Sequence, residues 1–230
     1  MRILTALCLI TLAAAPAGAA TRNFGVSGFD RIRIDGPYKV RVTTGVPPSA
    51  VASGPQRSLD GVTIEVQGRT LIVRNAKQSW GGFPDAASGP VEIALSTHDL
   101  SAAWVNGSGS VAINKVRGLS FDLSVQGSGS AAIAAVDVDQ FKLNIAGSGS
   151  ASLAGKVEKL TAVVQGISSL DAGGLRIDDA VFSADGPASI KATVTDTAKV
   201  QAHGTTAIEL AGRPSCTVRA TGSASISGCK

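Results

Sequence analysis

Histidines are the first candidates for chemistry in this sequence, and it contains two of them, His98 and His203. A serine or cysteine nucleophile needs a base held beside it, and a zinc ion needs three or four protein ligands. Asp185 and Thr221 lie 18 residues to either side of His203, a spacing that could bring a histidine and a carboxylate together without a third ligand. We therefore predict no catalytic residue, no metal site and no cofactor, and we interpret His203 as a solvated surface residue.

Paired carboxylates are the second candidate, because glycosidases use two carboxyl groups that face one sugar. Asp178 and Asp179 are neighbours, but successive side chains on a strand point to opposite faces, so we do not expect them to act together. Several acidic residues are predicted to lie beside basic residues in adjacent repeats: Asp137 beside Arg117, Asp196 beside Arg176, and Asp139, Lys159 and Asp178 in one column. Such pairs are typical of cross-strand support, worth about 0.2–1 kcal/mol each. A polysaccharide-acting enzyme is therefore the less favoured alternative to a non-enzymatic protein.

Basic residues gather near the N-terminus of a mildly basic chain, which has 21 Lys and Arg against 17 Asp and Glu. Arg31, Arg33, Lys39 and Arg41 alternate along the sequence and are predicted to lie on one side of the N-terminal strands. Such a stripe could attract anionic envelope glycans or lipid headgroups, and an ordinary solvated face is the alternative. Nucleic acid is not an expected partner, because a chain with one tyrosine lacks the interleaved aromatic residues that bind bases.

Aromatic residues offer a further candidate binding site. Trp80 and Phe83 lie in the glycine-rich stretch SWGGFPD at 79–85, which is predicted to be a loop. Their rings could form a lip for a sugar or a protein partner, or could fold back over the end of the core. Trp104, the second tryptophan, is predicted to point outward from a strand.

A repeat of about twenty residues must position all of these side chains. The motif G-S-G-S occurs at 107–110, 127–130 and 147–150, and related segments follow it. The first glycines of the series are Gly107, Gly127, Gly147, Gly166, Gly186, Gly204 and Gly222. Self-similarity at a fixed period indicates a solenoid of stacked coils. The motif lacks the lysine of a P-loop and the third glycine of a dinucleotide fingerprint, so no phosphate-binding function follows from it.

Each repeat alternates apolar and polar residues before its glycine, as at Phe121, Leu123 and Val125, which is the pattern of a strand with one buried face. Glycine and serine clusters exclude a helical solenoid, and Asn-Gly hairpin turns occur only at Asn106-Gly107. We therefore predict an all-β, single-stranded parallel β-helix with like residues stacked about 4.8 Å apart. One column of serines is expected to bond along the stack or to the corner backbone: Ser110, Ser130, Ser150, Ser169, Ser189 and Ser225.

The N-terminus has the features of a secretory signal peptide. Met1 and Arg2 precede the apolar run ILTALCLITLAAA, and the small residues that follow predict cleavage near Ala20 or Thr21. Cys8 lies inside the apolar run and is not predicted to be a lipoprotein acceptor. No later stretch is long and apolar enough for a membrane helix. We expect export to the periplasm, the cell surface or the medium, without a transmembrane segment after cleavage.

The two remaining cysteines, Cys216 and Cys229, are then in an oxidising environment and are predicted to form a disulfide. This bond would pin the last coil, and two free thiols in a redox role are the alternative.

We predict one domain, residues 21–230, after a leader of residues 1–20. Residues 101–230 form regular repeats, and residues 21–100 form irregular N-terminal rungs with a hairpin about Gly68. The segment D-G-P-Y-K-V at 35–40 matches D-G-P-A-S-I at 185–190, which predicts that it is the first rung. PVEIALS at 90–96 is predicted to be a strand that leads into the repeats.

Three features together resemble the GIN head domain family of putative autotransporter adhesins. They are the opening F-D-R-I-R-I-D-G-P-Y-K-V, the strand pair ending in G-R-T-L-I-V, and the x-G-S-G-S repeats. The resemblance covers most of the mature chain. It implies a right-handed parallel β-helix in an exported bacterial protein, and it supplies no catalytic residues.

We therefore expect an exported, non-enzymatic β-solenoid whose long face binds an envelope glycan or a surface protein in an adhesion role. The first alternative is a structural protein whose coil ends or flanks dock copies of the same chain into a homo-oligomer. The second alternative is the polysaccharide-acting enzyme.

Overall fold

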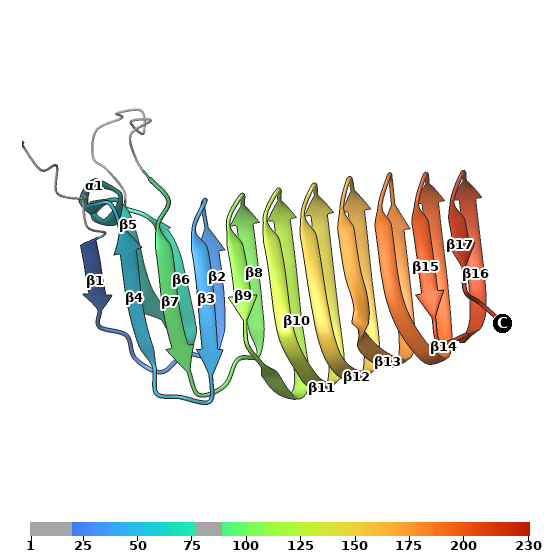
Figure 1. The fold of residues 1–230 in the computed structure, drawn as a ribbon, viewed down its shortest axis with the longest axis horizontal. Helices are drawn as coiled ribbons and strands as arrows, with labels where there is room; N and C mark the ends of the chain where they lie inside the picture. The colour runs from blue at the N-terminus through green and yellow to red at the C-terminus, as the bar shows by residue number, and fades with distance from the viewer. Residues whose placement is uncertain (1–19, 77–88) are drawn as a thin grey trace, which may run out of the picture.

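The computed structural model describes residues 20–76 and 89–230, which form a solenoid of stacked β-coils (Figure 1). The elements in chain order are β1 Ala20–Phe24, β2 Arg31–Asp35, β3 Lys39–Thr44, β4 Ser49–Gly54, α1 Gln56–Asp60, β5 Val62–Gln67, β6 Thr70–Asn75, β7 Glu92–Thr97, β8 Ala102–Gly107, β9 Ser110–Ile113, β10 Val116–Gly127, β11 Ser130–Gly147, β12 Ser150–Gly166, β13 Ser169–Asp185, β14 Ser189–Gly204, β15 Ala207–Ala211, β16 Ser215–Gly222 and β17 Ser225–Ser227.

Each regular coil has one segment that runs toward a glycine turn and one that runs back from it. The segments that run toward the turns form one sheet, which we call sheet 1. The segments that run back form the opposite sheet, sheet 2. A rounded bend joins the two sheets at the edge opposite the glycine turns (Figure 1). Neighbouring coils pair in parallel, so that Val125 lies beside Ile145 and Gly127 lies beside both Gly107 and Gly147. The predicted parallel β-solenoid with coils of about twenty residues is therefore confirmed.

The turn at Gly127 explains why its first residue is glycine. The φ angle of Gly127 is +101°, and a Cβ built there would lie 2.7 Å from the carbonyl oxygen of Gly107 in the coil below. The backbone N–H of Ser128 donates to that same oxygen at 3.0 Å. A side chain would therefore have to displace the hydrogen bond that joins the two coils.

The serine column occupies one register as predicted, from Ser110 to Ser225 with Ala207 as the one alanine in the series. The bonds from hydroxyl groups to the corner backbone come from a different position, one residue earlier. Ser168 Oγ donates to the carbonyl of Gly147 at 3.1 Å, and Thr206 Oγ1 donates to that of Gly186 at 2.9 Å. Both side chains are buried, so a hydroxyl group replaces the second glycine of the turn.

The core between the two sheets is filled by inward side chains whose sizes compensate. In the middle coils, large residues on sheet 1 beside the turns face small ones on sheet 2: Val125 and Ile145 accompany Ala131 and Ala151. Toward the C-terminus the small residues are on sheet 1 and the large ones on sheet 2: Ala184 and Ala202 accompany Ile190 and Ile208. Phe121 and Phe141 stack with ring centroids 5.4 Å apart and are fully buried. The coil cross-section therefore stays filled while the individual residues change.

Shorter coils lose their residues near the rounded bend, and this shifts the pairing there. The register slips between Ile133 and Val136 in the pairing of β11 with β12, and between Ala172 and Arg176 in that of β13 with β14. Arg117 does lie beside Asp137, as predicted.

Two predicted charge columns are wrong because of these slips. Lys159 lies beside Gln140 and Asp179, not beside Asp139 and Asp178. Arg176 lies beside Thr193, not beside Asp196.

The N-terminal rungs do not stack in chain order. Strands β2 and β3 pair with β8 and β9 on one side, with Arg33 beside Trp104 and Val40 beside Val111. On the other side they pair with β6 and β7. The D-G-P-Y-K-V segment is therefore a rung, but it is the second one, because the rung of β6 and β7 lies outside it. The predicted hairpin about Gly68 is confirmed by the antiparallel pairing of β5 with β6.

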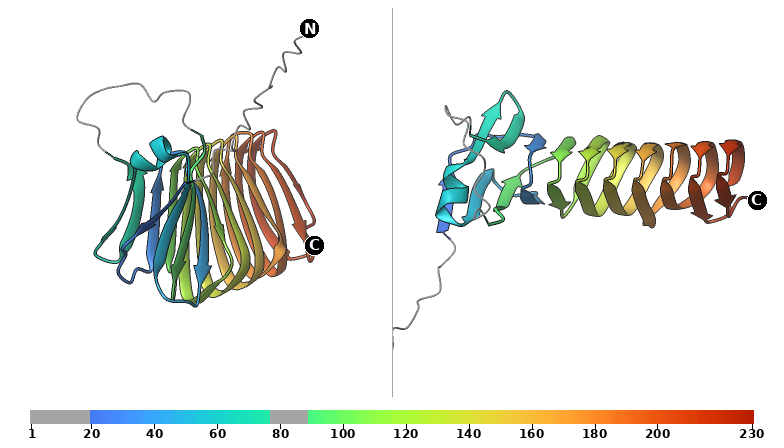
Figure 2. Two further views of the ribbon diagram at one scale, coloured as in Figure 1. Left: turned by 60° about the vertical axis from the view of Figure 1, so that its left-hand side comes forward. Right: turned by 90° about the horizontal axis from the view of Figure 1, so that it is seen from above.

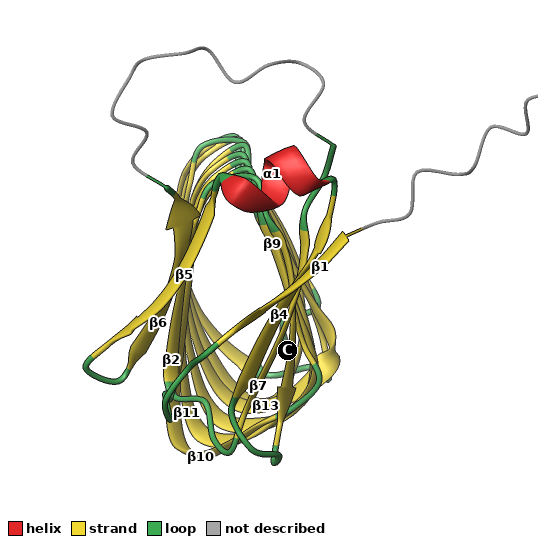
Figure 3. Cartoon of the chain, turned by 90° about the vertical axis from the view of Figure 1, so that its left-hand side faces the viewer, coloured by secondary structure: helices red, strands yellow, loops and turns green. Residues whose placement is uncertain are grey.

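This end of the solenoid is covered by further elements (Figures 2 and 3). Strand β5 extends sheet 1 beyond β6, while β4 and then β1 extend sheet 2 beyond β7 in antiparallel pairings. Helix α1 lies at the same end and buries Leu59, which is 1% exposed. The N-terminal end is therefore capped.

The last coil is formed by β16 and β17 and closed by a disulfide. Cys216 and Cys229 are bonded, as predicted. Cys216 takes the inward position of its column, beside Ala198 of the preceding coil. The backbone N–H of Lys230 also donates to the carbonyl of Pro214 at 3.1 Å. Both contacts hold the end of the chain against the start of its final coil.

The part of the chain that the structure describes contains no helix long and apolar enough to cross a membrane.

Candidate binding surface

The four basic residues predicted to form one stripe point away from the core but lie on two opposite faces. Arg31 and Arg33 belong to β2 in sheet 1, whereas Lys39 and Arg41 belong to β3 in sheet 2. The prediction of a single side is wrong because the chain turns at Gly36, whose φ is +127°, between the two pairs.

Acidic neighbours engage half of these basic residues. Arg33 Nη2 lies 2.8 Å from Asp35 Oδ2, and Arg41 Nη2 lies 4.0 Å from Glu92 Oε2. The four basic residues therefore form two separate pairs, one on each face.

The predicted aromatic lip of Trp80 and Phe83 lies outside the residues that the structure describes.

The candidates for catalysis are dispersed. His203 lies beside Asp185 and Thr221, as predicted, and its Nδ1 is 2.6 Å from Thr221 Oγ1. His98 lies far from it in the stack, next to the N-terminal rungs. Among the described residues, no three His, Cys, Asp or Glu side chains come together in a way that could hold a metal ion.

Asp178 and Asp179 bond to different threonines of the next coil. Thr195 Oγ1 donates to Asp178 Oδ1 at 3.1 Å, and Thr197 Oγ1 donates to Asp179 Oδ1. Each carboxylate therefore supports a neighbouring strand.

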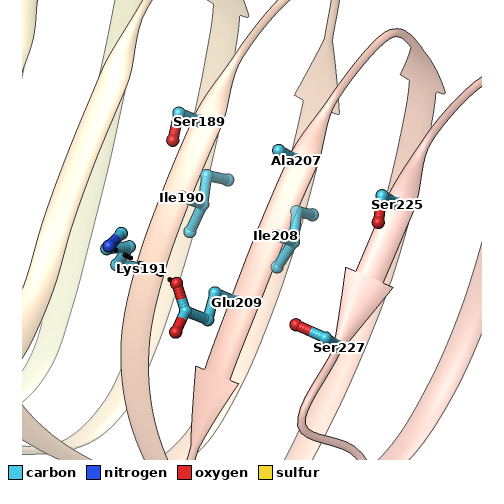
Figure 4. Close-up of a pocket in the computed structure, with 8 residues that line it drawn as sticks. All are labelled: Ser189, Ile190, Lys191, Ala207, Ile208, Glu209, Ser225 and Ser227. Atoms are coloured by element: carbon cyan, nitrogen blue, oxygen red, sulfur yellow. Dashed lines mark ion pairs between the residues drawn. The ribbon is translucent and has the colours of Figure 1, made fainter.

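A shallow hollow of about 270 Å³ lies on sheet 2 near the C-terminus (Figure 4). Small side chains such as Ser189, Ala207 and Ser225 line it, together with Lys191 and Glu209. Lys191 Nζ and Glu209 Oε2 are 3.4 Å apart, so the two charges on its wall engage each other. The hollow contains neither an aromatic ring nor a nucleophile with its base.

The outer face of sheet 1 has a more specific arrangement around Trp104. We call it the Trp104 surface, and it consists of Arg33, Asp35, Trp104, Asn106, Ser124 and Gln126. Three adjacent rungs supply these residues in two columns. Their neighbours along the strands, such as Ile34, Val105 and Val125, are fully buried. By alternation, the six side chains therefore point outward.

Hydrogen bonds fix the polar part of this surface. Arg33 Nε donates to Asp35 Oδ2 at 2.8 Å, and Asn106 Nδ2 donates to Asp35 Oδ1 at 2.7 Å. Partial burial alone would raise the pKa of Asp35. The bonds from Arg33 and Asn106 and the charges of Arg33 and Arg74 outweigh burial and lower the pKa of Asp35 below its ordinary value. The carboxylate therefore stays ionised, and its orientation is fixed.

The rung outside Arg33 continues the same face. Ile72 on β6 lies beside Arg33 and is 8% exposed. Arg74 Nη2 on the same strand lies 2.7 Å from Glu65 Oε1 of β5. Glu65, Ile72 and Arg33 thus lie in one column that leads to Trp104, which is half-buried. Ile72 lies between two charged residues that are each engaged in an ion pair.

On its other side, the Trp104 surface leads into outward amide groups. Ser124 lies beside Asn144, and Gln126 is followed two coils later in its column by Gln165. Asn144, Gln126 and Gln165 are exposed. An aromatic ring with fixed charged groups on one side and amides on the other can stack on an apolar face and bond to surrounding hydroxyl groups.

Sequence reasoning identified Trp104 and Arg33 separately but missed that they are neighbours, and it missed Asp35 and Asn106. A usable indication was present in the sequence. Aligning D-G-P-Y-K-V on the repeats places Gly36 with Gly107, which brings Asp35 next to Asn106.

Residues 28–214 match the family model described as "Putative auto-transporter adhesin, head GIN domain". The chain belongs to this family. The match covers the N-terminal rungs and nearly all the coils of this GIN head domain, including every residue of the Trp104 surface. Membership supports an adhesion-type role and an exported or surface location.

Several solved structures share the fold of this GIN head domain. A putative adhesin from Bacteroides fragilis has a TM-score of 0.80 at 20% identity, over 91% of this chain and 96% of that one. A putative lipid binding protein from Parabacteroides distasonis has a TM-score of 0.74 at 19% identity, over 92% and 96%. A putative adhesin from Parabacteroides merdae has a TM-score of 0.70 at 18% identity, over 92% and 96%. Among proteins with curated functions, none matches the chain.

Proposed function

We propose that this GIN head domain is an exported, non-enzymatic binding protein with an adhesion-type role, and that its Trp104 surface binds a glycan of the cell envelope. A sugar ring presents an apolar face of C–H groups and a rim of hydroxyl groups. Trp104 offers a ring to the first, and Asp35, Asn106 and Gln126 offer acceptors and donors to the second.

The single observation that carries this proposal is the fixed carboxylate of Asp35, on the strand that pairs with the strand of Trp104. Asp35 is bonded by Arg33 and Asn106 at 2.8 and 2.7 Å, so its orientation is set before a ligand arrives. A carboxylate oxygen can accept more than one hydrogen bond. Because the side chain is already ordered, binding a sugar hydroxyl group costs little additional conformational entropy.

The protonation of Asp35 supports binding over hydrolysis. A glycosidase acid needs a raised pKa to keep its proton at neutral pH. The pKa of Asp35 is lowered instead. Glu65, an acidic residue two strands away in the column of Arg33, is engaged by Arg74 at 2.7 Å. Asp35 therefore lacks the proton that a glycosidase acid must hold at neutral pH.

A glycan array with the chain from Ala20 onward tests the proposal. We expect bound glycans, and we expect Trp104→Ala to weaken binding to the best of them by about tenfold or more, which corresponds to about 1.4 kcal/mol. Val163→Ala is the matched control, because Val163 is a half-buried apolar residue in the same outward column of sheet 1, three coils away. Equal binding by wild type and Trp104→Ala would exclude the Trp104 surface.

The enzyme alternative is tested on the same ligands. Incubation of each bound polysaccharide with the protein should release neither reducing ends nor unsaturated products. Release of such products that is abolished by Asp35→Asn would show that this surface catalyses cleavage and does not merely bind.

Export is tested by fractionation. Both the family and the disulfide support it, because disulfides persist in oxidising compartments. We expect the protein in the envelope fractions or the medium, and a cytoplasmic protein with reduced Cys216 would contradict the proposal.

A further inference from the structure

The C-terminal end of the solenoid exposes side chains that earlier coils bury. Val218 takes the inward position of its column and is 42% exposed, whereas Val200 directly beneath it is 1% exposed. Ala220 is likewise exposed, although Ala202 beneath it is fully buried. The disulfide covers one side of this opening. The rest of the last coil presents its apolar interior.

Backbone groups at the same end also lack partners within the described residues. The N–H groups of Ser223 and Ser225 donate back to Gly204 and Thr206, at 2.9 Å each. Because the groups of successive residues in a strand point to opposite neighbours, those of Val218, Ala220 and Ile226 point away from the stack. No described strand lies beyond β16 and β17.

The sequence of these two edge strands does not block pairing. Exposed edges in monomeric proteins are usually protected by inward charges, prolines or a covering element. Strands β16 and β17 contain no proline, and their only charged residue, Arg219, points outward on sheet 1. The opposite end has its cap of α1, β1, β4 and β5, so it offers no matching open coil.

From these contrasts we infer that two copies of this chain dock through their C-terminal ends, about a two-fold axis that runs from the glycine edge of the coil to the rounded edge. Among two-fold axes in the plane of the end, only this one places glycine edge on glycine edge. It makes β16 of each copy the antiparallel neighbour of β17 of the other. Both open edges become paired, and assembly stops at two because the capped ends cannot continue it.

Charge complementarity agrees with this arrangement. The axis places sheet 1 of one copy against the end of sheet 2 of the other. Arg219 then lies beside Ser227 of the second copy, and that column continues with Glu209 and with Lys191, its ion-pair partner at 3.4 Å. Arg219 is therefore nearer to the acidic residue of this pair than to the basic one. An arrangement that paired β16 with β16 would instead bring the two Arg219 side chains toward each other.

The contact is small, so the dimer is expected to be weak and reversible. Strand β16 has 8 residues, which span about 26 Å at about 3.3 Å per residue, and facing sheets lie about 10 Å apart. With the width of the strands, the footprint is roughly 26 by 15 Å, or about 800 Å² for both copies together. That lies below the roughly 1,200 Å² of a standard stable interface.

Sedimentation and small-angle scattering over a range of concentrations test the inference on the chain from Ala20 onward. We expect a monomer–dimer equilibrium with no larger species, and a dimer elongated along the solenoid axis. Ala220→Lys, which places a charge on the docking end, should weaken the dimer by about tenfold or more. Thr217→Lys is the matched control, because Thr217 is exposed on the same strand but points out from sheet 1.

The remaining outcomes overturn the inference. They are a monomer at all concentrations up to about 1 mM, a series of longer oligomers, a dimer with the dimensions of side-by-side solenoids, or equal weakening by the two lysine variants. The orientation has its own test. Arg219→Glu should weaken the dimer more than Arg219→Ala does, and a dimer strengthened by Arg219→Ala would show that β16 pairs with β16.

Discussion

Asn106 and Asp35 are 71 residues apart in the sequence, and the Asn106 side chain donates a hydrogen bond of 2.7 Å to the Asp35 carboxylate. The bond exists because β2 stacks directly on β8, with Asp35 beside Asn106. It joins the irregular N-terminal rungs to the regular coils at the surface that we propose for glycan binding. The same contact therefore contributes both to stability and to the candidate site.

The first prediction concerns the pH dependence of this contact. The pKa of Asp35 is lowered in the folded state, so the ionised carboxylate stabilises the fold above its ordinary pKa of 3.8. That contribution is lost as the pH falls through the lowered value. Asp35→Asn should therefore lower the Tm at pH 7, and the difference from wild type should shrink toward pH 2. Asp122→Asn, at an exposed site on the same sheet, is the control. A difference that grows on acidification would contradict the argument.

The second prediction concerns the turn at Gly127. Gly127→Ala forces a side chain into a conformation with φ of +101° and places its Cβ against Gly107 O. We expect a loss of about 1–3 kcal/mol in the free energy of unfolding, measured by chemical denaturation. Ser128→Ala, at the exposed next position, should change it by less than about 0.5 kcal/mol. Similar values for the two variants would mean that the turn does not restrain the stack.

The third prediction concerns the stacked rings in the core. Phe141→Ala removes a fully buried ring that lies 5.4 Å from that of Phe121. The expected cost is about 3–5 kcal/mol, because neighbouring coils cannot collapse into the space. Lys142→Ala, on the exposed side of the same strand, serves as the control in the same denaturation series. A cost for Phe141→Ala below about 1 kcal/mol would indicate that the core repacks freely.

The fourth prediction concerns the disulfide. The two cysteines are separated by 13 positions in the sequence, and a cross-link over a loop of this length contributes about 3 kcal/mol to the free energy of unfolding through chain entropy. Coils contact only their neighbours, so this stabilisation should be felt locally. In the double variant Cys216→Ser with Cys229→Ser, hydrogen exchange should speed up in 207–230 and stay unchanged in 107–166. Equal acceleration in both segments would show that the solenoid unfolds as one unit.

The period and the alternation of the sequence were sufficient to predict the regular coils. Val125 lies beside Ile145 because both are two residues before a glycine that must turn the chain. The glycine turns restrain the register closely, whereas the rounded bends tolerate deletions. Lys159 follows such a deletion in its own coil, and the coil paired with Arg176 has another before Thr193. Their neighbours could therefore not be predicted by counting from the preceding glycine.

The N-terminal rungs and the site were less predictable. The four basic residues from Arg31 to Arg41 alternate as expected, but alternation alone does not reveal the turn at Gly36 that divides them; only the alignment of D-G-P-Y-K-V on the repeats indicates it. The rung of β6 and β7 shares no repeat motif with its neighbours, so its place outside β2 and β3 depends on packing that the sequence pattern does not express. Trp104 and Arg33 are neighbours because β2 stacks on β8.

The number of parallel coils sets the distance between the two ends of the molecule. The Trp104 surface lies near the capped end, and the open coil of β16 lies at the other. Each whole repeat between them sets these two surfaces about 4.8 Å further apart without altering either one. Gain or loss of a repeat would therefore change the distance between a bound glycan and the C-terminal docking end in fixed increments. The residues that bind at each end would stay the same.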